Sequence, residues 1–211
     1  MIFFNMRKDT TKHNKGFTLL ELMVSIGLFL VIVTIGIQAM LNTGNNYHKT
    51  QDLRSSMDGM SFVMEEMARN IRLGSHYHCK AFTGSMELPQ DCSTLTENSL
   101  SLAFENVDGL PYDAEGPNLE DQFIYRFSEV SGKGKIEKSV DGGDTFLDIT
   151  PIDVDIDLSK SGFSVFGSET PDDFIQPSVL IRISGTVLTK TNSTNFSIQT
   201  TVSQRAIEST I

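Results

Sequence analysis

The sequence predicts an α+β protein in which one long N-terminal helix packs on an antiparallel β-sheet. Three observations indicate this fold. Residues 17–37 form an apolar run, residues 53–73 place apolar side chains at helical spacing, and much of the chain after residue 98 alternates apolar and polar residues as strands do. A chain of 211 residues has room for such a helix and one further domain.

Residues 1–16 are predicted to be a leader that is removed from the mature protein. Four basic residues lie between positions 7 and 15, and Gly16 stands between them and the apolar run. An ordinary secretory signal has its small-residue cleavage site after the apolar region, whereas here the small residue precedes it. Cleavage after Gly16 would therefore keep the apolar helix.

Residues 17–41 are predicted to form a membrane-spanning helix. From Phe17 to Ile37 only Glu21 is charged, and at about 1.5 Å per residue this run can cross a hydrocarbon core about 30 Å thick. A carboxylate within such a segment is costly to bury, so Glu21 requires a cationic partner. The alternative is a plain signal anchor in which Glu21 lies near the lipid headgroups.

The stretch GFTLLE at residues 16–21, with the apolar run after it, resembles the N-terminal signal of type IV pilins and of the pseudopilins of type II secretion. The resemblance implies that a prepilin peptidase cuts between Gly16 and Phe17 and that the new amine of Phe17 is methylated. It also implies that Glu21 acts in assembly. The amine of Phe17 in one subunit and Glu21 of its neighbour would neutralise each other, and loss of either would leave a buried charge unpaired.

The last part of the chain narrows this resemblance. The residues QPSV at 176–179 and FSIQTTVSQR at 196–205 resemble the ending of minor pilins of the J and W type. This implies a pilin-like fold and a low-copy structural subunit, in a priming or tip complex of a type IV pilus or a type II secretion pseudopilus. The implied partners are prepilin peptidase, other pilin or pseudopilin subunits, and the inner membrane with its assembly platform.

The distribution of charge predicts where the protein lies. The basic leader precedes the apolar segment, so the positive-inside rule places everything after Leu41 outside the cytoplasm. The expected location is the inner membrane and then a surface or periplasmic filament. The whole chain has a net charge of -10, and removing residues 1–16 leaves 13 basic against 26 acidic residues, or -13. Direct contact with nucleic acid is therefore not expected.

Residues 42–74 are predicted to continue the helix beyond the membrane. The polar run at 42–46 is the place where the helix is expected to loosen, and Gly74 is expected to end it near Leu73. Apolar residues alternate spacings of four and three, which indicates a helix face in the core; a flexible methionine-lined binding groove is the alternative. These residues are Leu53, Met57, Met60, Met64, Met67 and Ile71.

Residues 75–211 are predicted to form a β-rich head domain. Residues 76–98 lack a sustained period and are expected to be a loop region. Alternation and β-branched residues then predict strands at 99–104, 122–128, 135–140, 145–149, 152–158, 162–166, 179–188 and 196–204.

The two cysteines, Cys79 and Cys92, are predicted to form a disulfide because the head is expected to lie in an oxidising compartment. The chain-entropy relation assigns about 3 kcal/mol to a loop of this length. The alternative is a metal site in which His76 and His78 join the cysteines, but their spacing matches no standard zinc pattern. The sequence therefore predicts no metal and no cofactor.

Two further groups of acidic residues were considered as sites. Asp153, Asp155 and Asp157 share one face of a predicted strand; calcium is the minor interpretation and a solvated face the main one, because a straight strand spreads such residues nearly 7 Å apart. Residues 139–146, SVDGGDTF, resemble a single Asp-box hairpin of sialidase propellers. Without repeats, this stretch is interpreted as turn chemistry.

Two other function classes remain as alternatives. A surface adhesin, anchored by an uncleaved helix, would use loops between residues 79 and 98 or around residues 108–121. An enzyme is not expected, because the head contains no nucleophile motif, no phosphate-binding glycine loop and no metal-ligand spacing.

Overall fold

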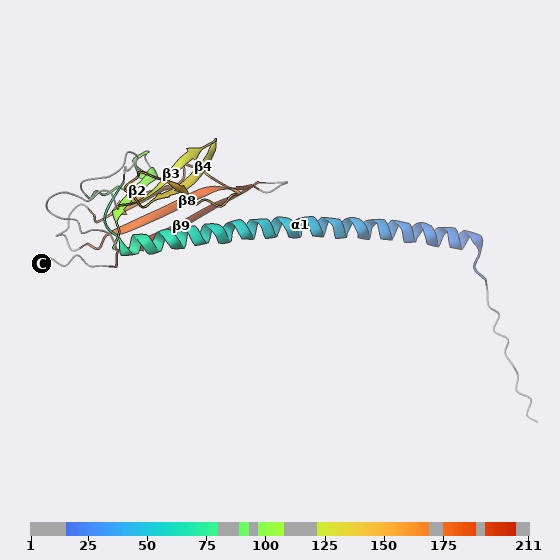
Figure 1. The fold of residues 1–211 in the computed structure, drawn as a ribbon. Coiled ribbons are helices and arrows are strands. Elements are labelled where there is room, and N and C mark those ends of the chain that lie inside the picture. The colour runs from blue at the N-terminus through green and yellow to red at the C-terminus, as the bar shows by residue number, and fades with distance from the viewer. Residues whose placement is uncertain are drawn as a thin grey trace, which may run out of the picture. The chain divides into compact units, whose positions relative to one another are not determined.

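The computed structural model describes residues 16–79, 89–92, 97–107, 122–168, 175–188 and 193–205. It confirms the α+β class, with one long helix followed by antiparallel sheets and a short 3-10 helix, η1 (Glu97–Leu100) (Figure 1). The chain forms two compact units, Met1–His48 and Lys49–Ile211. The second, here called the C-terminal unit, contains all the strands.

The helix α1 (Leu19–Leu73) is continuous over 55 residues. It passes through residues 42–46, where the sequence predicted loosening, because an asparagine costs well under 1 kcal/mol in a helix that is already nucleated. The helix ends as predicted at Leu73, where Gly74 N donates to Asn70 O at 3.0 Å. A side chain at Gly74 would collide with the ring of Phe104, so this position needs glycine for close packing.

The strands form two antiparallel sheets. The first sheet has the order β1-β2-β3-β4-β5. In the second sheet, β6 and β7 pair with one edge of β8, and β9 pairs with the whole of its other edge. The strands are β1 (Ser75–Cys79), β2 (Ser101–Glu105), β3 (Phe123–Val130), β4 (Lys133–Ser139), β5 (Leu147–Asp148), β6 (Val154–Ile156), β7 (Gly162–Phe166), β8 (Ser178–Leu188) and β9 (Ser193–Ser203).

All eight predicted strands are present, β7 with the predicted bounds and the other seven with shifted ends. The prediction of a loop from residue 76 was wrong, because β1 begins at Ser75. The pairing of β1 with β2 shifts register between Ser75 and His78. His76 lies in this irregular stretch with φ of 53°. A bulge of this kind breaks the two-residue period, which is the signal that identifies a strand in a sequence.

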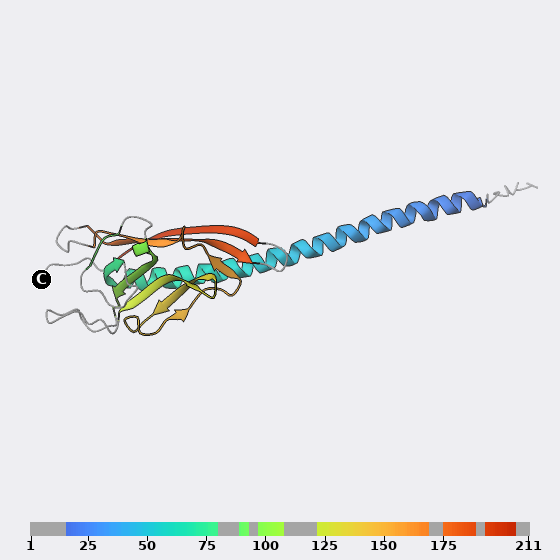
Figure 2. The same cartoon turned by 90° about the horizontal axis from the view of Figure 1, so that it is seen from above.

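The hydrophobic core lies between the last part of α1 and both sheets. The predicted methionine stripe is confirmed as core: Met60, Met67 and Ile71 are buried, and Leu53 and Met57 pack against them at its margin. Figure 2, from above, shows the red strands β8 and β9 on one side of this part of the helix and the yellow strands on the other. One apolar face of the helix thus packs against both sheets.

Polar contacts fix the helix on the first sheet. Asn70 Nδ2 donates to the hydroxyl of Tyr125 at 2.7 Å, and the hydroxyl of Tyr77 donates to Ile71 O at 2.6 Å. Lys138 Nζ lies 2.7 Å from Glu66 Oε1 in an ion pair that is mostly shielded from solvent. Hydrogen-bonded groups of this kind can be buried at little cost, so they set the position of the helix along the sheet.

The two sheets meet at a glycine. Gly134 of β4 lies so close to Ile156 of β6 that a side chain there would collide with the carbonyl oxygen of Ile156. The amide of Gly134 donates to Asp155 Oδ1 at 2.9 Å across the junction. The sequence pattern indicated one sheet, because alternation describes individual strands and contains no information about where a sheet ends.

The disulfide connects the sheets at a second point. Cys79 ends β1, and Cys92 forms a bridge to Val165 of β7 through backbone hydrogen bonds of 3.0 and 2.9 Å. Beside it, the carboxylate of Asp91 accepts the amides of Gly167 and Ser168 at 2.9 and 2.7 Å. The bond between Cys79 and Cys92 therefore joins the first sheet to the second.

The turn at residues 139–146 is a local hydrogen-bonded network, as its interpretation as turn chemistry requires. Ser139 Oγ donates to Asp141 Oδ1 at 2.6 Å, and Thr145 N donates to the same oxygen at 3.0 Å. Hydrogen bonds from Ser139 and then Thr145 lower the pKa of Asp141 to about 2. Gly142 and Gly143 have φ of 64° and 99°, a conformation that favours glycine.

Replacing both cysteines by alanine should lower the free energy of unfolding by about 3 kcal/mol, because the unfolded chain gains the freedom that a bridge across 13 positions removes. Urea unfolding followed by circular dichroism would measure the change as a lower midpoint. Reduction of the wild-type protein should give a similar shift, and reductant should not affect the Cys79→Ala/Cys92→Ala protein. Equal midpoints for oxidised and reduced wild type would contradict the expectation.

The C-terminal unit should lose stability in mild acid through His78. Burial lowers the pKa of His78 from 6.5 to about 4, so below pH 6.5 the unfolded chain binds a proton that the folded chain does not. The contribution of His78 to the free energy of unfolding is complete above pH 6.5. It is lost as the pH falls toward 4, and the loss is at most ~3 kcal/mol. Thermal unfolding of His78→Gln should lack this part of the pH slope and His76→Gln should keep it; an unchanged slope in His78→Gln would refute the assignment.

Candidate processing and assembly site

The residues before α1 form a short extended entry into the helix. Gly16, Phe17 and Thr18 precede the first helical residue, Leu19. Glu21 N donates to Thr18 Oγ1 at 3.2 Å, which makes Thr18 the N-cap and satisfies one of the free amides of the first turn. This role of Thr18 was not predicted, although Thr-x-x-Glu before an apolar run is the signal of a capping box.

The predicted assembly residues are exposed. Phe17 has 82% of its surface accessible, and Glu21 projects from the first turn of the helix. A carboxylate at this position interacts favourably with the partial positive charge of the helix N-terminus. In the described part of the chain, no cation forms an ion pair with Glu21. The pair that the resemblance implies would join two subunits.

The helix that follows exposes its apolar side chains on every face. The segment Leu19–Gly44 is 26 residues long, is apolar enough to cross a membrane, and has exposed side chains throughout. At about 1.5 Å per residue it is about 39 Å long, more than the ~30 Å of a hydrocarbon core. Its surface therefore requires lipid or other protein.

The hydroxyl groups inside this segment are satisfied by the helix itself. Ser25 Oγ donates to Glu21 O at 2.7 Å, and Thr34 Oγ1 donates to Leu30 O at 2.8 Å. Each bond runs back one turn to a main-chain carbonyl, so these side chains present no unpaired donor to an apolar environment. Glu21 remains the charged group of the segment.

The alternative interpretation of the cysteines as metal ligands is less consistent with the structure. Cys79 and Cys92 are joined to each other, so they are not free thiolates that could hold a metal with His76 and His78. Among the described residues, no group of three or more His, Cys, Asp or Glu side chains could hold a metal ion.

Two of the three aspartates in the calcium interpretation have separate partners for their carboxylates. Asp155 accepts the amide of Gly134, and Asp157 accepts Lys160 Nζ at 2.7 Å, an interaction that lowers the pKa of Asp157. Asp153 uses its main-chain carbonyl to accept the amide of Leu188 at 2.7 Å. The loops that an adhesin was expected to use, at 80–88, 93–96 and 108–121, lie outside the described residues.

Comparison with known proteins identifies the N-terminal stretch. A family model described as the prokaryotic N-terminal methylation motif matches residues 11–37, a range that contains Gly16, Phe17 and Glu21. No curated protein and no solved structure matches the chain. This motif is typical of type IV pilins and pseudopilins. The chain therefore carries the N-terminal methylation motif of these proteins, followed by the apolar helix that goes with it.

Proposed function

We propose that this protein is a structural minor pilin or pseudopilin subunit. It is cut by a prepilin peptidase between Gly16 and Phe17, methylated on Phe17, and assembled into a type IV pilus or a type II secretion pseudopilus, in a priming or tip complex. The observation that carries this proposal is an exposed apolar helix surface with a single acid in its first turn, within a stretch that matches a methylation motif.

The helix N-terminus supports a role for charge pairing. Cleavage after Gly16 would place a cationic amine on Phe17, two residues before the helix begins. A positive charge is unfavourable at the N-terminal end of a helix, where the macrodipole is also positive, so this amine benefits from a carboxylate nearby. Glu21 of a neighbouring subunit would supply it, and within an apolar helix bundle the pair would fix the register of the two helices.

The proposed location follows from the same features. Residues 17–41 would span the inner membrane with the leader in the cytoplasm, and residues 42–74 would carry the head domain, residues 75–211, on the other side. Extraction into a filament then replaces lipid by the helices of other subunits. The compact C-terminal unit, which begins at Lys49, has its own core and is compatible with this role.

A minor position in the filament is supported by the residues that resemble minor pilins of the J and W type. These residues form the start of β8 and most of β9, a hairpin paired from Ser178↔Ser203 to Leu188↔Ser193. The proteins that carry the methylation motif form a structural family, which supports a structural role.

The deciding experiment is the mass of the N-terminal peptide in sheared surface filaments and in membranes. A filament chain that begins at methylated Phe17 is the expected result. A chain that retains residues 1–16 and stays in the membrane, in cells with an active peptidase, would refute processing and favour an anchored adhesin.

Replacing Glu21 by glutamine should block assembly without blocking processing. The variant removes the partner of the amine on Phe17, and a buried charge left alone costs about 3–5 kcal/mol, or more than ~100-fold in incorporation. Quantitative immunoblots of sheared filaments and membranes would measure this loss, with the exposed Glu65→Gln as the matched control. Incorporation of Glu21→Gln at the wild-type level would contradict the charge-pairing role.

A further inference from the structure

The outer edge of β9 is a long stretch of main chain without a strand partner in the described residues. β9 pairs with β8 over 11 positions with no bulge. The opposite edge of β8 is occupied by β7 near its start and by β6 near its end. In the described ranges, β9 is therefore the last strand on its side of the second sheet.

The hydrogen bonds of Ser184 in β8 show which groups of β9 point outward. Ser184 O accepts the amide of Asp157 at 2.8 Å, and Ser184 N donates to Ser161 Oγ at 2.9 Å, so the main chain of Ser184 faces β6 and β7. Across the ladder, Ser184 lies opposite Ser197. The pair exchanges no main-chain hydrogen bonds, and the N–H and C=O of Ser197 therefore point to the open edge.

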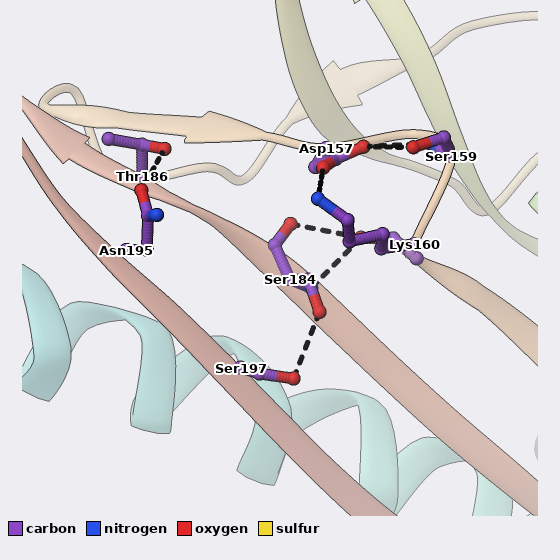
Figure 3. A network of polar contacts seen from close by, with 8 residues as sticks. Asp157, Ser159, Lys160, Ser184, Thr186, Asn195 and Ser197 are labelled. Atoms are coloured by element: carbon purple, nitrogen blue, oxygen red, sulfur yellow. Dashed lines mark hydrogen bonds and ion pairs between the residues drawn. The ribbon is translucent and has the colours of Figure 1, made fainter.

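The same direction applies to every second residue of β9, because the ladder has no irregularity. Asn195, Gln199 and Thr201 thus offer their N–H and C=O groups outward together with Ser197. Side chains agree with this pairing: the hydroxyls of Ser184 and Ser197 are 2.9 Å apart, and Thr186 donates to Asn195 at 3.1 Å (Figure 3).

Proteins normally protect such an edge, and the residues of β9 lack the protection that a sequence can provide. Lysine, proline and bulges discourage another strand from pairing with an edge. Residues 193–203 contain no charged residue, no proline and no bulge. On the face that turns toward the core, Phe196 and Ile198 are only partly buried, so a further strand would cover apolar surface as well as main chain.

We propose that β9 accepts an extended segment of a different pilin-type subunit, which adds a strand to the second sheet. The outward groups of Asn195, Ser197, Gln199 and Thr201 would bind its main chain, and apolar residues at alternate positions would cover Phe196 and Ile198. This inference rests on the proposed function for the identity of the donor.

A second copy of the chain fits this edge less well. The processed chain has 13 basic and 26 acidic residues, so two copies repel each other. Antiparallel pairing of β9 with another β9 would also turn one head end over end, whereas subunits inserted in one membrane face the same way. An extended segment of another subunit does not meet the second obstacle, because its direction is not fixed by that of β9.

Photo-cross-linking in filament-producing cells tests the proposal on the full chain. A photoreactive amino acid at Gln199 should cross-link to a second subunit that carries an N-terminal methylation motif, with the peptide identified by mass spectrometry in filament and membrane fractions. The control is Val140, which is 51% exposed and lies after β4. Absence of a second subunit at Gln199 in both fractions, or equal capture at Val140, would overturn the proposal.

A proline distinguishes main-chain pairing from general proximity. Ser197→Pro removes an outward N–H without removing a hydrogen bond to β8, whereas Ser197→Ala keeps that N–H. The cross-link from Gln199 should be lost in Ser197→Pro and kept in Ser197→Ala. A cross-link of unchanged yield in Ser197→Pro would overturn strand addition. If thermal unfolding shows that the proline variant is not folded, the proposal is accepted or rejected on the cross-link from Gln199 in the otherwise wild-type chain.

The N-terminal peptide is measured in the same samples, which separates the two proposals. A chain that begins at Phe17 but gives no cross-link at Gln199 would refute the β9 inference alone. A chain that retains residues 1–16 would refute processing. Capture of a protein without the motif would refute the assigned donor.

Discussion

The structure depends on the way one helix distributes its apolar side chains. In the segment Leu19–Gly44 they cover every face and are exposed, whereas from Leu53 to Ile71 they form one stripe that is buried against both sheets. The chain therefore buries the apolar side chains of the second half of the helix itself, whereas those of the first half require lipid or other protein. Glu21 adds a charge that the hydrocarbon core of a membrane cannot neutralise.

Two links hold the sheets that receive the stripe. At one link, Gly134 allows the main chains of β4 and β6 to approach, and Asp155 closes the contact with a hydrogen bond. At the other, the bond between Cys79 and Cys92 connects β1 with the segment that pairs with β7. Because hydrophobic packing has no direction, these specific contacts set the angle at which the two sheets share the helix.

Local patterns in the sequence predicted most of this fold. The spacing from Leu53 to Ile71 placed the core face of the helix correctly, and alternation located eight of the nine strands that the structure describes. The features that were not predicted depend on contacts between distant parts of the sequence or on irregular backbone. The bulge at His76 breaks the alternation of β1, so this strand was not predicted. The contact at Gly134, where the two sheets meet, involves residues about 20 positions apart in the sequence.

The candidate site shows the same division. The motif from Gly16 to Glu21 is recognisable because its elements are adjacent in sequence, and Thr18 could have been added from the capping-box spacing. The open edge of β9 could not be found in this way. Its sequence alternates like that of any half-buried strand, and only the pairing of Ser184 with both neighbours shows which amides remain outside.

The two proposed contacts between subunits have different physical character. Pairing between Phe17 and Glu21 exchanges one charge for another in an apolar environment, so it discriminates strongly and fixes register. Strand addition at β9 uses uncharged main chain and is less sensitive to salt, while the alternate side chains of the donor provide selectivity. Because residues 193–203 carry no charge, the proposed strand would pair there without burying a charged side chain of β9. A low-copy subunit that must select its neighbour, and not merely polymerise, has use for both contacts.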